Sequence, residues 1–261
     1  VVASTHNVPA ADYEASDRWD QNPVYRRRSI EAFDRCASIL VLLEEFRDWF
    51  PARLRERVSV VPNPVAALGP VADADQAEAR KVILGVGRLT AVKRFDLLLS
   101  AWRRIAHAHP GWSGEIVGVG PEEASLRQQI DAAGAGFPAR LRGVTADVAR
   151  FYESAAILCH PAAYEGFGLV VGEALAQGVP VVGFADCPGV NMLVRDGENG
   201  LLVPPGSDRA ANLAEALGRL LGDPSLRTRL AAAAPASVAR FAPSIVYDQW
   251  EEILRRTAGS V

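Results

Sequence analysis

The feature that most constrains this chain is a regular alternation, beginning at Lys81, of short apolar runs with longer amphipathic segments. The apolar runs have strand length and lie at 82–86, 115–119, 139–143, 156–159 and 179–183. Helices are expected between and after them at 95–105, 122–133, 146–153, 169–177, 208–221, 224–238 and 244–256. The first of these carries large apolar side chains on one face, namely Phe95, Leu98, Leu99, Trp102 and Ile105. The alternation predicts an α/β fold with a parallel sheet covered on both faces, and such sheets bind ligands at the carboxyl ends of their strands.

The residues before this alternation have a weaker pattern. Strand-like runs lie at 1–5, 38–43 and 58–61, with an amphipathic helix expected at 26–35 and a second, polar helix before the last run. Proline disfavours helix on both sides, so Pro62–Pro64 marks the start of a linker and a domain boundary near residue 64. The chain opens on a strand without an initiator methionine, and we expect it to start inside a domain.

The composition indicates a globular protein that does not depend on polyanion binding. Hydrophobic residues make up 49% and charged residues 23%, and the net charge of -3 argues against electrostatic binding to nucleic acid. The basic run Arg26–Arg28 is interpreted as a solvated helix face, with an anionic lipid or acceptor as the alternative. No run of about 18 apolar residues predicts a transmembrane helix, which leaves peripheral contact with the inner membrane open. Three distant cysteines fit neither a zinc site nor a disulfide framework, so we expect a cytoplasmic setting.

The first candidate site is the segment Gly85–Leu89, at the end of a strand-like run, with Lys93 five residues after Arg88. Glycines let the backbone approach a ligand, a following helix presents free N–H groups, and two cations add charge-assisted bonds to a diphosphate. The dinucleotide fingerprint G-x-G-x-x-G is not met, because Thr90 occupies its last glycine position. A tight turn with two solvated cations explains this segment alone equally well.

The second candidate site is the segment 164–180, in which Glu165 and Glu173 are separated by seven residues. Glycines at 166 and 168 follow a strand and open a helix, whose unpaired amides would face a diphosphate. Glu173 lies one turn inside that helix, where a carboxylate can accept hydrogen bonds from ribose hydroxyls. An isolated pair of this kind is more often solvated, and a retaining hydrolase would need its two carboxyl groups about 5 Å apart.

Taken in order, these motifs resemble the retaining glycosyltransferases of the GT-B fold, in the large family four. The segment 164–180 resembles the E-x7-E signature of that family, and Arg88 with Lys93 resembles its G-R-x4-K phosphate site. The segment Val117–Pro121 is similar to the family's second glycine turn, and Asp196–Val203 is similar to its D-G-x-N-G-x-L-V stretch. The resemblance extends over roughly residues 58–221.

The resemblance implies a site for a UDP- or GDP-linked nucleotide sugar. The residues implied to hold this donor are Gly87, Arg88, Lys93, Gly166, Phe167, Gly168, Leu169 and Glu173. Glu165 would lie beside the donor sugar and His6 would face that sugar from the N-terminal domain, so these two are the candidate catalytic residues. No cofactor and no metal ion are expected, because no His, Cys and Asp cluster has ligand spacing. Positive charge at the leaving group would come from the two cations and the helix end.

The resemblance also implies an organisation and a reaction. Residues 1–64 would be the C-terminal part of an acceptor-side Rossmann-like domain whose start is missing, 65–243 the donor-binding domain, and 244–261 a crossover helix. The implied reaction transfers a hexosyl unit, with retention, to a carbohydrate, a lipid-linked or another acceptor. A GT-B nucleotide-sugar epimerase, a sugar phosphorylase and a non-catalytic nucleotide-sugar-binding module remain alternatives. The base is expected to be read near Arg142–Thr145, largely by backbone groups.

Overall fold

The computed structural model describes residues 1–14, 25–71 and 79–259, without the side chains of 25–27. The basic run at 26–28 therefore lies largely outside the described side chains. The chain divides into two compact units, each described below by itself. Unit 1 comprises Val1–Pro64, Glu165–Phe167 and Arg240–Val261, and unit 2 comprises Val65–Tyr164 and Gly168–Ala239. The division after residue 239 falls slightly before the boundary expected at 243.

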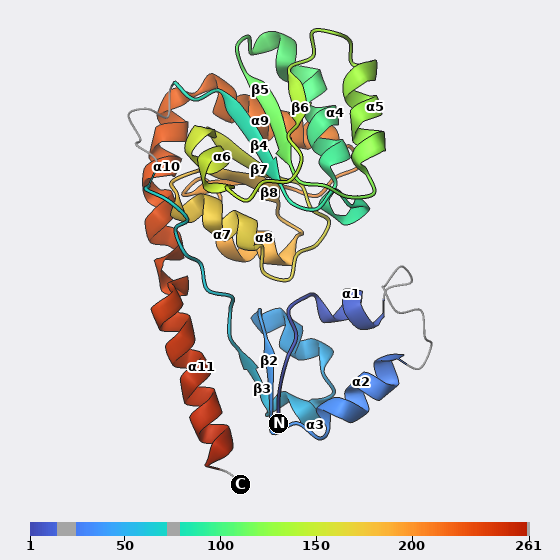
Figure 1. The fold of residues 1–261 in the computed structure, drawn as a ribbon, viewed down its shortest axis with the longest axis vertical. Helices are drawn as coiled ribbons and strands as arrows, with labels where there is room; N and C mark the ends of the chain where they lie inside the picture. The colour runs from blue at the N-terminus through green and yellow to red at the C-terminus, as the bar shows by residue number, and fades with distance from the viewer. Residues whose placement is uncertain (15–24, 72–78, 260–261) are drawn as a thin grey trace. The chain divides into compact units, whose positions relative to one another are not determined.

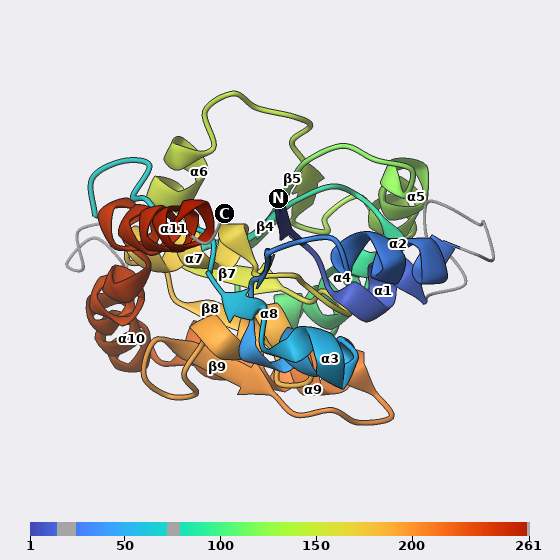
Figure 2. The same ribbon diagram turned by 90° about the horizontal axis from the view of Figure 1, so that it is seen from below.

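Unit 2 is built on a sheet of six parallel strands in the order β6-β5-β4-β7-β8-β9, of which Figure 1 labels β4 to β8 and Figure 2 labels β9. The strands are β4 (Val82–Val86), β5 (Ser113–Val117), β6 (Ala139–Leu141), β7 (Ile157–His160), β8 (Val181–Phe184) and β9 (Gly200–Val203). The parallel α/β fold predicted from the alternation is confirmed. The chain leaves β4 toward β5 on one side and returns to β7 on the other. The carboxyl end of β4 is therefore the crevice where such sheets bind ligands.

Helices cover both faces of this sheet, with α4 and α5 on one side of the strands and α6 and α7 on the other (Figures 1 and 2). The helices are α4 (Phe95–Ile105), α5 (Glu123–Ala132), α6 (Ala149–Ser154), α7 (Leu169–Ala176), α8 (Pro188–Leu193), α9 (Arg209–Gly222) and α10 (Pro224–Val238). Short 3-10 turns lie at η3 (Ala91–Lys93), η4 (Ala106–Ala108) and η5 (Ala239–Phe241).

The core of unit 2 forms where α4 and α9 pack on the sheet. Along the predicted apolar face of α4, Phe95, Leu98, Leu99 and Trp102 are buried, and Ile105 packs against them partly buried. Each fully buried large apolar side chain contributes about 1.5–3 kcal/mol. The Trp102 indole also donates a hydrogen bond of 3.0 Å to the Pro138 carbonyl, so its polar atom is satisfied inside the core. This packing holds the start of α4, and with it the end of β4, in a fixed place.

Unit 1 contains a smaller parallel sheet in the order β1-β2-β3 and the last helix of the chain. Its elements are β1 (Val2–Ser4), α1 (Pro9–Tyr13), α2 (Tyr25–Phe33), β2 (Ser38–Val41), η1 (Glu44–Trp49), α3 (Ala52–Arg55), β3 (Val58–Val60) and α11 (Pro243–Ala258). Val246 and Ile253 of α11 join Leu40 and Val61 in a buried cluster. The closing helix therefore shares its core with the first sheet.

Some elements differ from the expectation in ways that local chemistry explains. The strand expected at 115–119 ends at Val117, because Gly118 adopts a φ of 147° that turns the chain. The polar helix expected before β3 is two short pieces, η1 and α3, separated at Pro51, which has extended backbone. Strand β9 and helix α8 were not expected. Helix α8 begins with Pro188 and Gly189, which do not indicate a helix, and β9 lies within the stretch 196–203 that was interpreted as a motif.

Candidate functional site

Two glycine turns pack against each other at the carboxyl ends of β4 and β5. The Gly87 amide donates a 3.0 Å hydrogen bond to the Val117 carbonyl, and the Leu89 amide donates one of 3.0 Å to the Val119 carbonyl. A Cβ atom on Gly118 would lie 1.9 Å from the Gly87 oxygen. The φ angle is 148° at Gly87 and 147° at Gly118, and residues with a side chain rarely adopt such values. Glycine is required at 118 because two backbones meet there, and at 87 because of its positive φ.

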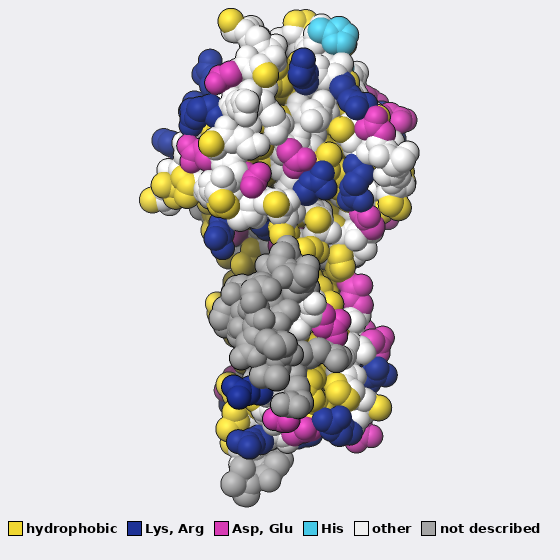
Figure 3. Space-filling model, turned by 90° about the vertical axis from the view of Figure 1, so that its right-hand side faces the viewer, with side chains coloured by type: hydrophobic (Ala, Val, Ile, Leu, Met, Phe, Trp, Pro, Cys, Tyr) yellow, Lys and Arg dark blue, Asp and Glu magenta, His cyan; other side chains and the backbone are white. Residues whose placement is uncertain are grey.

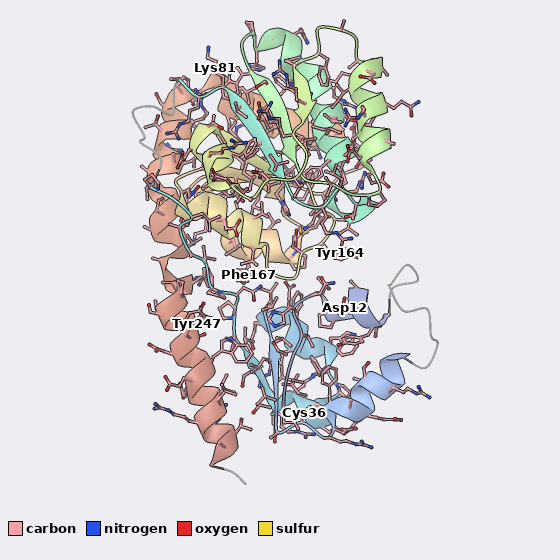
Figure 4. All side chains as sticks on the ribbon, in the orientation of Figure 1. Asp12, Cys36, Lys81, Tyr164, Phe167 and Tyr247 are labelled. Atoms are coloured by element: carbon pink, nitrogen blue, oxygen red, sulfur yellow. The ribbon has the colours of Figure 1, made fainter. Side chains whose placement is uncertain are left out.

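A cavity of about 270 Å³ opens beside these turns, entirely within unit 2. It is lined by Val86, Gly87, Arg88, Val117, Gly118, Val119, Val144, Thr145, Val148 and Glu173. Most of the wall is apolar, with one cation and one carboxylate among the lining side chains. In Figure 4, Lys81 lies at the amino end of β4, and Tyr164 lies in the segment that follows the carboxyl end of β7. An apolar slot with few polar groups is typical of a small-molecule site.

The Lys93 side chain lies over the first glycine turn. Its Cε atom is 3.7 Å from the place that a Cβ atom on Gly87 would occupy. Arg88 is exposed at the mouth of the cavity. The structure therefore brings the two predicted phosphate-binding cations to the carboxyl end of the same strand, β4.

Helix α7 begins at Leu169, after Gly168 in the left-handed conformation with φ 83°. Within the part of the chain that the structure describes, no side chain caps this helix start. The Gly168 carbonyl accepts the first helical hydrogen bonds, from Val171 at 2.9 Å and Gly172 at 3.0 Å. The amides that precede these in the first turn have no carbonyl of their own helix to bond, so the helix start favours an anion.

Glu173 enters the cavity from α7 and is held by a buried tyrosine. The Tyr152 hydroxyl donates a 3.0 Å hydrogen bond to the Glu173 Oε2 atom. Burial raises the pKa of Glu173, and the bond from Tyr152 lowers it in part. Burial, together with the Glu173 charge, raises the pKa of Tyr152, which keeps its hydroxyl protonated as a donor. The carboxylate can thus accept one fixed bond from the protein and further bonds from a ligand hydroxyl.

The other predicted residues lie in unit 1. Gly166 and His6 approach each other closely, since a Cβ atom on Gly166 would lie 2.7 Å from the His6 carbonyl oxygen. His6 is exposed after β1, and its Nε2 atom lies 3.0 Å from the Ser4 hydroxyl. Phe167 is buried against Phe241 in an edge-to-face contact with ring centroids 5.5 Å apart. Its side chain belongs to the core, so only its backbone is available to a ligand.

Glu165 is partly buried in the same short segment of unit 1. The predicted site residues therefore separate into two groups. Arg88, Lys93 and Glu173, with their glycine turns, belong to unit 2, whereas His6 and Glu165 belong to unit 1.

The loop that was expected to read the base begins after β6. The Thr145 hydroxyl accepts a 3.0 Å hydrogen bond from the Asp147 amide, so it is engaged within its own turn. The Arg142 guanidinium lies 3.4 Å from the Glu115 carboxylate. These side chains are engaged with other groups of the protein, which leaves backbone groups and the exposed Val144 as the surfaces offered to a base.

The motif Asp196–Val203 has a structural role. The buried Asn199 amide donates to the Leu193 carbonyl and to the Ser237 hydroxyl, and its oxygen accepts from the Arg195 amide at 2.7 Å. The Asp196 carboxylate accepts from the Leu202 amide at 2.9 Å. These bonds form the turn that leads into β9, and they leave little capacity for a ligand.

Sequence reasoning did not identify Tyr152 as a functional residue. An aromatic residue on an amphipathic helix is usually interpreted as core, and Tyr152 is indeed fully buried. A buried tyrosine needs a hydrogen-bond partner for its hydroxyl, and that requirement is the one signal that pointed beyond packing.

Further features limit the chemistry of the described residues. Among residues 1–14, 25–71 and 79–259, no three His, Cys, Asp or Glu side chains are grouped so that they could hold a metal ion. No helix in these ranges has both the length and the apolar character to cross a membrane. Figure 3 shows acidic and basic side chains interspersed on the face that it draws, which fits the small net charge of -3.

The parallel sheet, with a cavity at its carboxyl edge, places the protein in the Rossmann-like class of α/β folds. The chain belongs to the family of glycosyl transferases group 1, whose pattern matches residues 72–237, more than half of the chain. It is 34% identical to an uncharacterized glycosyltransferase of Haemophilus influenzae over 174 residues, which are 67% of this chain and 49% of the relative. The chain thus spans about half the length of this curated relative.

Solved structures of glycosyltransferases share the fold. The pneumococcal O-GlcNAc transferase GtfA, in complex with UDP and GlcNAc, aligns with a TM-score of 0.82 at 20% identity, covering 98% of this chain and 52% of that one. The Anabaena protein HepE, in complex with UDP-glucose, aligns with a TM-score of 0.80 at 22% identity, covering 98% and 72%. These likenesses confirm the expected GT-B type of fold.

Proposed function

We propose that this chain contains the donor site of a retaining glycosyltransferase that moves a hexosyl unit from a nucleotide-diphospho-sugar to an acceptor, with the nucleoside diphosphate as leaving group. The observation that carries the proposal is the cavity at the ends of β4 and β5, where Arg88 and Glu173 line one apolar slot. Lys93 over Gly87 and the start of α7 add positive potential at the same edge of the sheet. A base packs against an apolar surface, a ribose donates to a carboxylate, and a diphosphate binds where the potential is positive. These three surfaces lie at one edge of the sheet.

The base would lie against the valines of the slot, and the ribose hydroxyls would donate to Glu173. Glu173 is suited to this role because Tyr152 fixes one of its oxygens and leaves the other for the ligand. UDP is the diphosphate that we propose. The pneumococcal and Anabaena structures named above contain UDP, which supports this choice.

The diphosphate would be met by Arg88, Lys93 and the amides at the start of α7. As the glycosidic bond breaks, negative charge grows on the diphosphate, and groups already aimed at that charge stabilise the transition state more than the ground state. No metal ion is needed in this scheme, because the two cations and the helix start supply the charge. The acceptor would attack from the face that the leaving group vacates, which retains the anomeric configuration.

Glu165 and His6 are proposed to act at the sugar, Glu165 by accepting hydrogen bonds from sugar hydroxyls and His6 by facing the transferred ring. The close approach of Gly166 to the His6 backbone supports a shared place for these two residues in unit 1. The acceptor is proposed to be a carbohydrate or a lipid-linked glycan.

The proposal is tested by incubating the protein with UDP-hexoses and a panel of acceptors. We expect transfer, and NMR of the product should show the same anomeric configuration as the donor. Inverted product would contradict retention. Binding of UDP without transfer to water or to any acceptor would favour the non-catalytic binding module.

A further inference from the structure

Arg94, directly after Lys93, has an unusual backbone conformation. With φ 51° and ψ 39°, it is the one non-glycine residue with positive φ in the described part of the chain. The left-handed region brings Cβ close to the backbone, so a residue other than glycine, asparagine or aspartate rarely occupies it. Strained residues of this kind concentrate at functional sites, where the surrounding structure holds them in place.

A two-pronged ion pair accompanies this conformation. The Arg94 Nε atom donates to Asp96 Oδ1 at 3.1 Å, and Nη2 donates to Oδ2 at 3.1 Å. The two residues are only two positions apart, on either side of Phe95, whose ring is buried in the core. The pair therefore closes a small loop around the junction between η3 and α4. We call this pair the Arg94–Asp96 clasp.

The junction determines where Lys93 lies. The chain makes one 3-10 turn, η3, reverses direction at Arg94 and enters α4 at Phe95. The Lys93 amide donates to the Thr90 carbonyl at 3.0 Å, and the Leu97 amide donates to the Arg94 carbonyl at 2.9 Å. Because Lys93 sits immediately before the reversal, a change of φ at Arg94 moves its side chain relative to Gly87.

We infer that the Arg94–Asp96 clasp is a positioning device that holds Arg94 in the left-handed conformation and thereby keeps Lys93 over the phosphate-binding turn. This inference rests on the proposed function, since it takes Lys93 to contact the diphosphate. Arg94 acts through Lys93 and does not itself contact the ligand. Its guanidinium is engaged by Asp96.

For substitutions of Arg94 and Asp96, the clasp and simple electrostatics predict different changes in UDP affinity. Removing the arginine charge near a phosphate site should weaken binding, and removing the aspartate charge should strengthen it. The clasp predicts instead that the aspartate variant loses UDP affinity and the arginine variant does not. Arg94→Gly should be nearly silent, because glycine adopts positive φ without strain. Asp96→Ala should weaken binding, because it leaves a strained arginine without its clasp.

The experiment measures the dissociation constants of UDP and uridine by calorimetry for the protein and four variants. For Asp96→Ala we expect UDP affinity to fall about 3- to 10-fold, which is about 0.6–1.4 kcal/mol, with uridine affinity unchanged. For Arg94→Gly we expect a change within about 2-fold for both ligands. The double variant Arg94→Gly/Asp96→Ala should recover UDP affinity to within about 2-fold of the unaltered protein.

The double variant separates the clasp from a loss of helix stability. Asp96 also lies in the first turn of α4, where a carboxylate favours the helix. If Asp96→Ala acts only by weakening α4, the double variant will bind UDP as poorly as Asp96→Ala, and the inference is wrong. A loss of UDP affinity in Arg94→Gly equal to that in Asp96→Ala would also overturn it, because Arg94 would then contact the phosphates.

Lys93→Ala is the fourth variant, and it tests the proposed function separately. We expect UDP affinity to fall about 10-fold or more, with uridine unaffected. If Lys93→Ala leaves UDP affinity unchanged, the phosphate role of Lys93 in the proposed function fails. If Lys93→Ala weakens UDP binding and Asp96→Ala does not, the phosphate role stands and the clasp fails.

Discussion

Replacing Tyr152 with phenylalanine removes one hydroxyl and tests how the carboxylate in the cavity is held. That hydroxyl donates to Glu173 at 3.0 Å, and its other contact, to the Val170 carbonyl, is long at 3.5 Å. A hydrogen bond to a charged group contributes about 1.5–3 kcal/mol, and the partial exposure of Glu173 to solvent reduces this. For Tyr152→Phe we therefore expect the free energy of unfolding to fall by about 1–1.5 kcal/mol at pH 7.5.

The loss should depend on pH with a defined sign. Burial raises the pKa of Glu173 above 4.5 in the folded protein, so its ionisation opposes folding as pH rises through that range. Without the Tyr152 bond the folded-state pKa rises further, and the difference in stability between the two proteins should grow as pH rises through the folded-state pKa of Glu173. At pH below that pKa the carboxyl group is neutral in both folded proteins, and the difference should be smallest.

Urea denaturation at several pH values measures this difference. Tyr247→Phe is the matched control, because Tyr247 on α11 is 60% exposed, and this change should leave stability within about 0.5 kcal/mol of the unaltered protein. A loss in Tyr152→Phe that is the same at every pH would show that packing, and not the bond to a charged carboxylate, accounts for it. If Tyr152→Phe lowers the free energy of unfolding no more than Tyr247→Phe does, the hydrogen bond to Glu173 contributes nothing measurable to stability.

Further predictions concern single residues of the site. Glu173→Gln should weaken binding of UDP more than of its 2′,3′-dideoxy analogue, measured by calorimetry; equal losses would exclude contact with the ribose. Gly118→Ala should destabilise unit 2 by about 2–4 kcal/mol in thermal or urea unfolding, since its Cβ would lie 1.9 Å from the Gly87 oxygen. Gly134→Ala, where φ is positive but no atom lies within 4 Å, should cost only about 1 kcal/mol, and similar losses at both glycines would contradict the steric argument. Glu165→Ala should keep UDP affinity and abolish sugar transfer, whereas a matching loss of UDP affinity would place Glu165 at the nucleotide.

The fold of unit 2 was predictable because short apolar runs alternate regularly with amphipathic segments along the chain. Helix α4 shows the reason, since four of its five predicted core residues are buried and the fifth packs beside them. The strand run 82–86 coincides with β4, because a continuous apolar run is what a strand buried on both faces requires. Strand β9 is as long as β7 and β8, but it follows a turn held by the buried Asn199, and a local pattern does not reveal those contacts.

The parts of the site that depend on residue type and spacing were predictable from the sequence. The parts that depend on contacts between distant residues were not. Glycine turns, two cations and a carboxylate at fixed spacing could be found in the sequence. The bond from Tyr152 to Glu173 joins residues on different helices, and the left-handed conformation of Arg94 has no sequence signal, because arginine rarely adopts it. The division of Glu165 from Glu173 between two units likewise could not be derived from their spacing along the chain.

The central claim is that the cavity at the carboxyl ends of β4 and β5 binds a nucleoside diphosphate with Arg88 at its phosphate end. Calorimetric titration with UDP and with uridine tests it most directly, in the protein, in Arg88→Ala and in the control Arg103→Ala, an exposed cation that lines a different hollow of unit 2. We expect Arg88→Ala to weaken UDP binding by about 1.5–3 kcal/mol and to leave uridine binding nearly unchanged, while the control alters neither. Equal losses for UDP and uridine in Arg88→Ala, or an unaltered UDP affinity, would contradict it.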